Sequence, residues 1–313
     1  MSKREDFTNR LRKNAKHWDK WARRHDLSCY RLYDRDLPSF PLAIDRYADH
    51  LHVQEFETAW EADVEEYAAW RETCFEVVAS ALDVPRARIH FKQRRRQRGT
   101  AQYEKTGVQG EDFVVTEQGL KFWVNLDAYL DTGLFLDHRN TRRMVRERAA
   151  DKRFLNLFAY TGSFSVYAAA GGATESTTVD LSNTYQDWTQ RNFELNGLDA
   201  QAHRLVRADV TQFLAEAAWR RERYDLIVMD PPSFSNSKKM QGVLDVQRDH
   251  VALIDGCLRI LAPGGELIFS NNRRGFQLDK AVSKAGTVRD ISRQTVPEDF
   301  SNKRIHQCWV IRA

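Results

Sequence analysis

The sequence lacks the features of a membrane protein or a secreted protein. It contains no uninterrupted run of about 18 apolar residues, the length that crosses a bilayer. The first residues, MSKREDFTNRLRKN, contain no apolar signal core. The four cysteines form no CxxC pair and no zinc spacing, which predicts reduced thiols with neither a disulfide nor a metal. These absences predict a cytoplasmic protein.

Net charge is also small, and lysine is scarce. The 313 residues include 48 Lys and Arg against 44 Asp and Glu, a formal charge of +4. This balance excludes a basic tail protein or an acidic solubilising protein, and 42% hydrophobic residues exclude disorder as the main state. Only 13 of the 48 basic residues are lysine, so 35 are arginine. Arginine suits phosphate recognition and stacking on flat rings, which favours a nucleic-acid partner.

The first two segments of the chain are predicted at residues 1–27 and 28–130. The first is a basic amphipathic helix with apolar residues at helical spacing. Four basic residues recur every fourth position on another face: Arg12, Lys16, Lys20 and Arg24. They fit either phosphate contacts or a solvated helix face. The second segment reads as a small α+β domain, with a hairpin turn at YAD, a helix over 59–82, and strand-turn-strand patterns in RIHFKQRRRQRG and EDFVVTEQGLKFWVNLDAY.

Residues 131–313 have a different organisation, because apolar strands alternate with helical segments. Seven strands are predicted, at residues 153–158, 174–180, 202–209, 224–230, 265–272, 287–296 and 305–312. This pattern indicates a doubly wound α/β sheet with buried parallel strands. Ligands of such sheets bind outside the carboxyl ends of the strands, at the topological switch point. The residues that follow each strand are therefore the candidate site.

The first three strand ends favour an adenosine-containing ligand. A plain GxGxxG is absent, since Phe158 and Tyr160 stand where glycines would be, which disfavours NAD. Asp180 ends the second strand and can accept from ribose hydroxyls. Asp209 lies at the end of the third strand and can accept from the adenine amino group. Each acid alone is equally compatible with a helix cap.

The fourth strand ends in Asp230-Pro231-Pro232-Ser233-Phe234. Two prolines after a buried strand predict a rigid extended loop. The simpler interpretation is a strand terminator. The functional one is a wall beside a planar base, on which Phe234 could stack.

These features in this order resemble class I methyltransferases that use S-adenosylmethionine. The strings GLFLDHR and LNLFAYTGSFSVYAA are similar to an RNA methyltransferase group that includes 23S rRNA cytosine-C5 enzymes and the guanine-N7 (K) half of a fused K/L enzyme. Further strings resemble the K half: NRLRKNAKHWDKWARRHDLSCYRLYDRDLP, PLAIDRY, DPPSFSNSKKM and FSNNRRGF. The resemblance implies a seven-stranded sheet with an antiparallel last strand, an N-terminal RNA-binding domain and S-adenosylmethionine as cofactor. It also implies 23S rRNA or its large-subunit precursor as partner, with a separate guanine-N2 methyltransferase as a further partner.

The resemblance also assigns residues to the cofactor and to the target base. The cofactor-binding residues would be Asp137, Arg139, Asn156, Phe158, Ala159, Thr161, Gly162, Asp180, Leu181, Ser182, Asp209, Val210 and Asp230. Arg139 could pair with the cofactor carboxylate. The catalytic residues that frame the base would be Asp230, Pro231, Pro232 and Phe234.

The string after the fifth strand discriminates between reactions. Methylation of cytosine C5 needs a thiolate that adds to C6, and the cytosine enzymes of the group carry it in a Phe-Ser-Cys-Ser string. Here the string is Phe269-Ser270-Asn271-Asn272. Guanine N7 has an in-plane lone pair and needs only a positioned methyl donor. We therefore expect guanine-N7 methylation. The alternatives are an rRNA or tRNA base methyltransferase of other specificity, for exocyclic guanine N2 or cytosine C5, and a non-catalytic RNA-binding module.

RNA binding is predicted on basic residues outside the pocket. Besides the four of the first helix, these are Arg94, Arg95, Arg96 and Arg98 in a predicted hairpin, and Lys238, Lys239, Arg273 and Arg274 at the pocket mouth.

Overall fold

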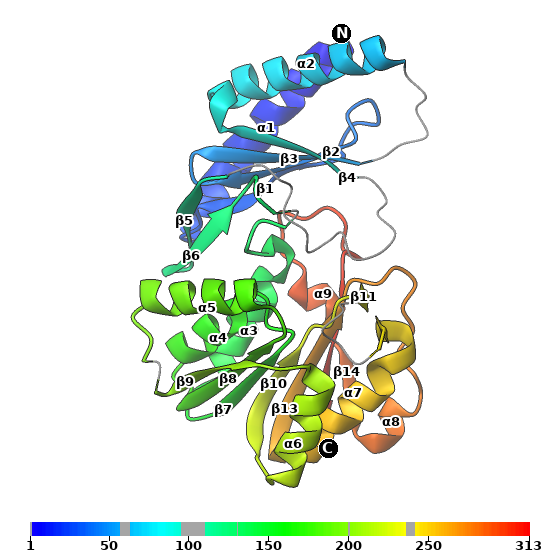
Figure 1. The fold of residues 1–313 in the computed structure, drawn as a ribbon. Helices are drawn as coiled ribbons and strands as arrows, with labels where there is room; N and C mark the ends of the chain where they lie inside the picture. The colour runs from blue at the N-terminus through cyan, green and yellow to red at the C-terminus, as the bar shows by residue number, and fades with distance from the viewer. Residues whose placement is uncertain (1, 57–62, 95–109, 130, 200, 236–241) are drawn as a thin grey trace. The chain divides into compact units, whose positions relative to one another are not determined.

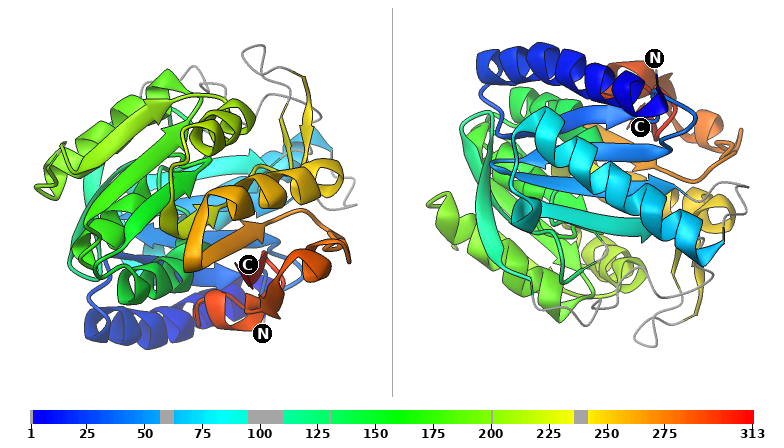
Figure 2. Two further views of the ribbon diagram at one scale, coloured as in Figure 1. Left: turned by 90° about the horizontal axis from the view of Figure 1, so that it is seen from below. Right: turned by 90° about the horizontal axis from the view of Figure 1, so that it is seen from above.

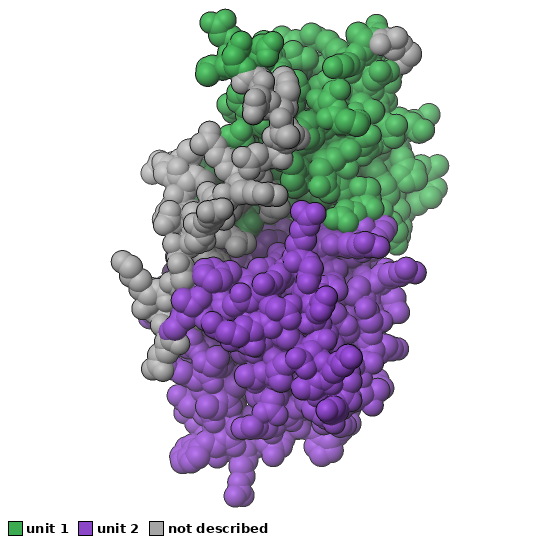
Figure 3. All heavy atoms as spheres, turned by 90° about the vertical axis from the view of Figure 1, so that its right-hand side faces the viewer, with its two compact units in different colours: residues 1–98, 103–132, 298–302 green, residues 99–102, 133–297, 303–313 purple. Residues whose placement is uncertain are grey.

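The computed structural model describes residues 2–56, 63–94, 110–129, 131–199, 201–235 and 242–313, and the chain forms two compact units (Figures 1 and 3). Unit 1 comprises residues 1–98, 103–132 and 298–302, and unit 2 comprises the rest. Each unit has its own hydrophobic core. No helix in these ranges is long and apolar enough to cross a membrane.

Unit 1 is a four-stranded sheet with two helices across one face (Figure 2, right). The strands β1 (Cys29–Asp34), β2 (Leu42–Tyr47) and β3 (His50–Phe56) are antiparallel, and β4 (Ile89–Arg94) joins β3 in parallel after a short helix, η1 (Arg86–Arg88). The helices are α1 (Lys3–Arg24) and α2 (Val64–Leu82), and a hairpin of β5 (Asp112–Glu117) and β6 (Leu120–Asn125) completes the unit. The turn predicted at YAD joins β2 to β3.

The amphipathic character of α1 explains how it lies on the sheet. Ser2 Oγ accepts from the Glu5 N–H at 3.2 Å while a Glu5 carboxylate oxygen accepts from the Ser2 N–H at 2.8 Å, a capping box that fixes the first turn. Phe7 and Leu11 are fully buried, and the Phe7 ring stacks on Phe40 with centroids 4.0 Å apart. The predicted apolar face is therefore the packed face of the helix.

Residues 298–302 belong to unit 1 although they lie close to the end of the chain. Asp299 accepts the Arg31 N–H at 2.8 Å, and the Phe300 ring lies 4.2 Å from the Arg31 guanidinium carbon. Arg31 is itself buried and forms two hydrogen bonds to Asp45, at 2.7 and 3.0 Å. The Ser301 hydroxyl donates to Asp34 at 2.8 Å, so that polar contacts hold this segment at both ends.

Unit 2 contains the predicted seven-stranded sheet, in the order β14-β15-β13-β10-β7-β8-β9. Its strands are β7 (Arg153–Leu157), β8 (Glu175–Asp180), β9 (His203–Arg207), β10 (Tyr224–Met229), β13 (Leu261–Asn271), β14 (Thr287–Asp290) and β15 (Gln307–Arg312). β15 runs antiparallel to both of its neighbours and the five strands from β13 to β9 are parallel, which confirms the predicted fold class.

Helices cover both faces of this sheet (Figure 2, left). The helices α6 (Val210–Trp219) and α7 (Val246–Ile260) pack on one face, against residues such as Ile227, Met229 and Phe269. The opposite face packs against α3 (Arg139–Arg148) and α4 (Ser163–Ala170), while α5 (Asn183–Leu195) covers β8 and β9. The short helices are η3 (Leu136–His138), α8 (Val282–Ala285) and α9 (Ser292–Thr295).

One predicted strand is wrong in part. Residues 287–296 were expected to be a single strand, but β14 stops at Asp290 and α9 follows. The Asp290 carboxylate accepts from the Ser292 N–H at 2.8 Å and from the Ser292 hydroxyl at 2.6 Å. This local hydrogen bonding ends the strand and starts a helical turn.

Candidate functional site

The carboxyl ends of the parallel strands hold most of the predicted cofactor residues. Leu157 and Met229 lie side by side in the register at the ends of β7 and β10. Asp180 ends β8, Asp209 follows β9 and Asp230 follows β10. The fold therefore brings the three acids to one edge of the sheet, at the switch point between β7 and β10.

The loop after β7 has the backbone of a glycine-rich loop, although only one of its residues is glycine. Phe158, Tyr160 and Gly162 have φ values of 56°, 53° and 73°, in the left-handed region. This region costs a non-glycine residue roughly 1–2 kcal/mol. At Gly162 no side chain fits, because a Cβ atom would lie 2.3 Å from Thr189 Cγ2. Two aromatic residues thus adopt the conformation that glycines would supply.

Polar side chains of the neighbouring elements hold this loop. The Tyr160 N–H donates to Asp180 Oδ2 at 2.9 Å, and the Tyr160 carbonyl accepts from the Thr189 hydroxyl at 3.1 Å. The Thr161 carbonyl accepts from Asn192 Nδ2 at 2.9 Å. Sequence reasoning missed Thr189 and Asn192, because nothing in a helical pattern separates a polar residue that faces inward from one that faces solvent.

Asn156 is buried beneath the loop. Its Nδ2 donates to Ser165 Oγ at 3.0 Å, and Ser165 Oγ lies 2.7 Å from Thr178 Oγ1. These groups join β7, α4 and β8 behind the loop, and Thr161 is fully buried as well. The expected contacts of Asn156 and Thr161 with the methionine part of a cofactor stay predictions.

Asp180 is held by two backbone N–H groups. Its Oδ2 accepts from Tyr160 and its Oδ1 accepts from Ser182, each at 2.9 Å. Burial raises the pKa of Asp180 to about 6 against the opposing effect of these bonds. A carboxylate has about four lone-pair positions, so acceptor positions remain for the ribose hydroxyls of an adenosine-containing ligand.

Asp209 caps the helix that follows it. Its Oδ1 accepts from the Thr211 N–H at 2.8 Å, from the Thr211 hydroxyl and from the Gln212 N–H at 3.3 Å. Its Oδ2 receives no hydrogen bond from any residue that the structure describes. Asp209 is therefore a cap with one oxygen left for an amino group, and Val210 next to it is buried.

Asp230 opens the Asp-Pro-Pro loop with both oxygens engaged. Oδ1 accepts from the Ser270 hydroxyl at 2.7 Å, and Oδ2 lies 3.4 Å from His138 Nε2. Pro231 is buried and Pro232 is half-buried. The prolines restrict the backbone of this loop, and its first side chain has contacts on two sides.

The aromatic residue of this loop is displaced outward. Ser233 follows the prolines, and its hydroxyl donates to Asn272 Oδ1 at 2.8 Å. Phe234 pairs with Asp245 in a short ribbon of β11 (Phe234–Ser235) and β12 (Leu244–Asp245). Phe234 is 45% exposed, as one of the few large hydrophobic residues on the surface of the described part of the chain, and an aromatic side chain there can stack on a base.

Two histidines that the sequence did not single out lie behind Asp230. His306 Nδ1 is 3.0 Å from Asp137 Oδ2, and the His306 and His138 rings stack at 4.2 Å with an interplanar angle of 11°. Asp137 thus contacts a histidine, while Arg139, also expected at the cofactor, is buried. His138 is visible in the string LDHR, but no sequence signal connects it to His306, which precedes the last strand.

Asp137, His138 and His306 offer ligand atoms within 4.8 Å of one another, but their arrangement favours hydrogen bonding over metal binding. A metal ion binds an imidazole nitrogen at about 2.0–2.1 Å, along a lone pair in the ring plane. Two rings stacked nearly parallel have separate planes, so one ion position cannot satisfy both.

The basic residues predicted for RNA binding fall into three groups. Those of α1 are all exposed, with no ion pair to a described residue: Arg12, Lys16, Lys20 and Arg24. Arg273 is half-buried and ion-paired with Asp245, while Arg274 is exposed. The Arg94 side chain and residues Arg95, Arg96, Arg98, Lys238 and Lys239 lie outside the described part of the structure.

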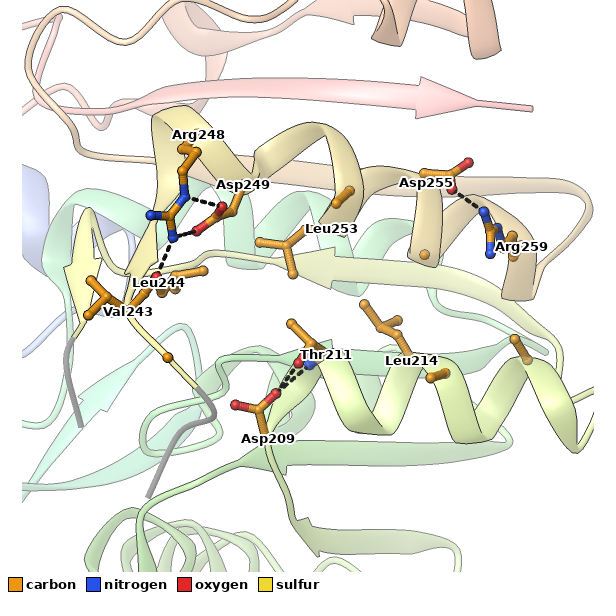
Figure 4. Close-up of a pocket in the computed structure, with 15 residues that line it drawn as sticks. Asp209, Thr211, Leu214, Val243, Leu244, Arg248, Asp249, Leu253, Asp255 and Arg259 are labelled. Carbon is orange, nitrogen blue, oxygen red and sulfur yellow. Dashed lines mark hydrogen bonds and ion pairs between the residues drawn. The ribbon is translucent and has the colours of Figure 1, made fainter. Parts of the chain in front are cut away.

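A groove of about 490 Å³ runs between α6 and α7 (Figure 4). Leu214 and Leu253 face it from the two helices, and Asp209 and Thr211 lie at one end with Val243. Asp209 is the only one of the predicted cofactor residues that lines this groove. The groove therefore meets the strand-end site at Asp209 and otherwise follows the two helices.

Comparison with known proteins concerns the fold and the family of the chain. A family model described as S-adenosylmethionine-dependent methyltransferase matches residues 30–305. A methyltransferase solved in complex with SAH superposes with a TM-score of 0.79 at 26% identity, covering 100% of this chain and 82% of that one.

Curated relatives are similar over almost the whole chain. Ribosomal RNA large subunit methyltransferase K of Neisseria meningitidis is 61% identical over 306 residues, 98% of this chain and 86% of the relative. Ribosomal RNA large subunit methyltransferase K/L of Methylococcus capsulatus is 50% identical over 313 residues, so this chain spans 42% of that relative's length. Because the family model covers most of the chain and the strand-end acids suit the cofactor, the chain belongs to the S-adenosylmethionine-dependent methyltransferases.

Proposed function

We propose that this methyltransferase modifies N7 of a guanine in 23S rRNA. The names of the K and K/L relatives support rRNA of the large subunit as the substrate. The observation that carries the choice of base atom is Asn271 at the end of β13, where the cytosine-C5 enzymes of the similar group have their thiol.

The four cysteines of the chain support the same choice, because all of them are buried and free. Cys257 lies in α7 with its sulfur 3.7 Å from Met229 Sδ, and burial raises its pKa far above that of an ordinary thiol. Cys308 is in the core of β15, and burial raises its pKa as well. A thiolate that adds to a pyrimidine needs the opposite environment, accessible and with a lowered pKa.

Methyl transfer to guanine N7 requires positioning and electrostatics. The positive charge of the sulfonium moves to the base as the methyl group moves, and N7 has no proton to lose. The carboxylate of Asp230 can stabilise the developing positive charge. The exposed Phe234 ring offers a surface on which a base taken out of its stack can lie.

The exposed basic face of α1 supports an RNA substrate. Its four cations lie on successive helical turns, about 6 Å apart along the axis, with no carboxylate partner among the described residues. Replacing all four with glutamine should weaken rRNA binding and reduce the slope of log K against log salt by up to about 3.6, since each phosphate contact contributes about 0.9. Arg220→Gln with Arg259→Gln is the matched control, because these cations are ion-paired with Glu216 and Asp255.

Exocyclic guanine N2 is the alternative that the Asp-Pro-Pro loop allows. Enzymes that methylate amino groups usually place an aromatic residue directly after the prolines, where this chain has Ser233 hydrogen-bonded to Asn272. Because the aromatic residue, Phe234, stands one position further along, we favour methylation of the ring nitrogen N7 over methylation of the amino group. A separate guanine-N2 methyltransferase acting on the same rRNA is part of the proposal, and co-purification from a tagged strain tests it.

The decisive experiment maps methylated nucleosides in rRNA from a strain that lacks this gene. The proposal expects one 7-methylguanosine of 23S rRNA to disappear and to return when purified enzyme and S-adenosylmethionine are added. Retention of every 7-methylguanosine would refute the proposal that this enzyme methylates guanine N7. Calorimetry with S-adenosylmethionine distinguishes an enzyme from the non-catalytic alternative, because an RNA-binding module would not bind the cofactor.

A further inference from the structure

A layer of buried polar residues lies behind the carboxylate of Asp230. The Asp230 side chain is 26% exposed, while those of His138 and His306 are 6% and 0% exposed. Ser270 and His138 approach different oxygens of the carboxylate, at 2.7 and 3.4 Å. Two contacts on two oxygens fix the plane of the carboxylate, and its accessible lone pairs remain available to a substrate.

Two contacts bear on the proton of His138. Its Nδ1 lies 3.3 Å from the Thr141 hydroxyl, and its Nε2 lies 3.4 Å from Asp230 Oδ2 and 3.9 Å from Asp137 Oδ2. We assign the tautomer in which the Thr141 hydroxyl donates to Nδ1 and the Nε2–H faces the nearer carboxylate, that of Asp230. Burial and the adjacent imidazole of His306 lower the pKa of His138, in agreement with a neutral ring. A neutral donor orients Asp230 without adding a positive charge next to the reacting base.

His306 fixes the position of the His138 ring. Its Nδ1 faces the Asp137 carboxylate at 3.0 Å, and its Nε2 lies 2.9 Å from Thr295 Oγ1. With both nitrogens engaged, the His306 ring cannot rotate, and His138 stacks flat against it. The ring of His138 is thus fixed on its face by His306 and at its edge by Thr141.

We infer that His138 and His306 are positioning residues for Asp230, with His138 donating a hydrogen bond to the carboxylate and His306 holding His138 in place. The inference rests on the proposed position of Asp230 beside the target base. Neither histidine reaches the surface, so both act through Asp230. A misplacement of about 1 Å at a reacting group can cost about 100-fold in rate.

The test compares two substitutions of His138 that separate its shape from its hydrogen bond. His138→Gln retains an N–H donor, and His138→Phe retains the flat ring for stacking but has no donor. We expect His138→Phe to lower kcat for rRNA methylation by about 10- to 100-fold, with little change in KM or in the Kd of S-adenosylmethionine. His138→Gln should restore most of the loss.

Control variants use a buried histidine away from the site. His203 starts β9, at the opposite end of the strands, and its Nδ1 lies 3.0 Å from Ser176 Oγ. His203→Gln and His203→Phe should leave kcat unchanged. If His138→Phe does not fold, Thr141→Val removes only the hydroxyl that orients His138, and we expect it to lower kcat with unchanged cofactor affinity. Wild-type kcat in the soluble His138→Phe or Thr141→Val enzyme would overturn the inference. So would equal losses in His138→Phe and His138→Gln, or a parallel loss of cofactor binding.

Transfer of tritiated methyl groups to rRNA measures kcat, and nucleoside analysis of the same product identifies the modified atom. A product other than 7-methylguanosine would contradict the proposed function, whereas the ratio of the His138→Gln and His138→Phe rates would still test the positioning inference.

Discussion

Asp180 and Asp209 look alike in the sequence, since each ends or follows a parallel strand and each precedes a helix. In the structure they differ. The carboxylate of Asp180 binds the backbone of the neighbouring loop through Tyr160 and leaves the cap of α5 to Ser182, whose hydroxyl accepts from the Tyr185 N–H at 3.4 Å. Asp209 is itself the cap of α6.

The difference comes from the distance between each acid and its helix. Two residues separate Asp180 from the first residue of α5, whereas Asp209 is followed directly by the first residue of α6. An acid that does not cap the helix can accept hydrogen bonds from the loop and from a ligand. An acid in the cap position binds its own helix first, so we expect Asp180 to control cofactor binding and Asp209 to contribute mainly to stability.

The largest expected effect is that of Asp180→Ala on the cofactor. The change removes an acceptor for the ribose and releases the Tyr160 N–H, and hydrogen bonds to charged groups contribute about 1.5–3 kcal/mol each. The Kd of S-adenosylmethionine, measured by calorimetry, should rise by about 100-fold or more. Asp187→Ala, at an exposed position of α5, should have no effect. A change of less than about threefold in Asp180→Ala would show that Asp180 does not control cofactor binding.

Gly162→Ala is next, because it disturbs the loop that Asp180 holds. The new Cβ collides with Thr189 Cγ2, and the alanine must adopt the left-handed φ of 73° that Gly162 has. We expect a loss of about 2–4 kcal/mol in the free energy of unfolding, from strain and overpacking together. Adding Thr189→Ser removes the colliding methyl group and should recover part of that loss in thermal unfolding. No recovery would mean that backbone strain alone is responsible.

The pKa of Asp180 predicts opposite effects of pH on binding and on folding. Because the folded-state pKa is raised from 3.8 to about 6, the stabilising contribution of this group is present below pH 4 and is lost as the pH rises through 6. Cofactor binding that needs the ionised carboxylate should weaken by about tenfold per pH unit below 6. Calorimetry between pH 5 and 8 measures this, and Asp180→Asn should show a weaker, flatter dependence.

Asp209→Ala should have the smallest effect on the cofactor and a clear effect on the fold. Loss of an N-cap costs about 0.5–2 kcal/mol, which chemical denaturation can resolve. Asp209→Ser retains a capping oxygen and should restore stability without restoring the oxygen offered to the adenine amino group. A cofactor affinity that falls as far as in Asp180→Ala would show that both acids do the same work.

The sequence predicted the sheet well because buried parallel strands are continuous apolar runs, such as Leu226 to Met229 in β10. It also placed Asp180, Asp209 and Asp230 at strand ends, since the doubly wound fold brings those ends together. The short helix α9 was missed because the hydrogen bonds from Ser292 to Asp290 that start it are local and leave no periodic pattern in the sequence.

The stacked histidines show why the remainder of the site could not be predicted. His306 contacts Asp137 across 169 positions of the chain, and neither residue type nor spacing signals the pair. The same holds for Thr189 and Asn192, whose inward direction depends on the packing of α5 against the loop. Contacts that only tertiary structure creates leave no periodic pattern.

The segment from residue 298 to 302 has a consequence for synthesis of the chain. Unit 1 needs Asp299 for the N–H of the buried Arg31, but residues 133–297 of unit 2 are made in between. At about 5–20 residues per second, the ribosome takes on the order of 10–30 seconds to span that interval. The N-terminal unit must therefore wait, incomplete, while the catalytic sheet is translated, and it acquires its last polar contacts only when β15 is about to emerge.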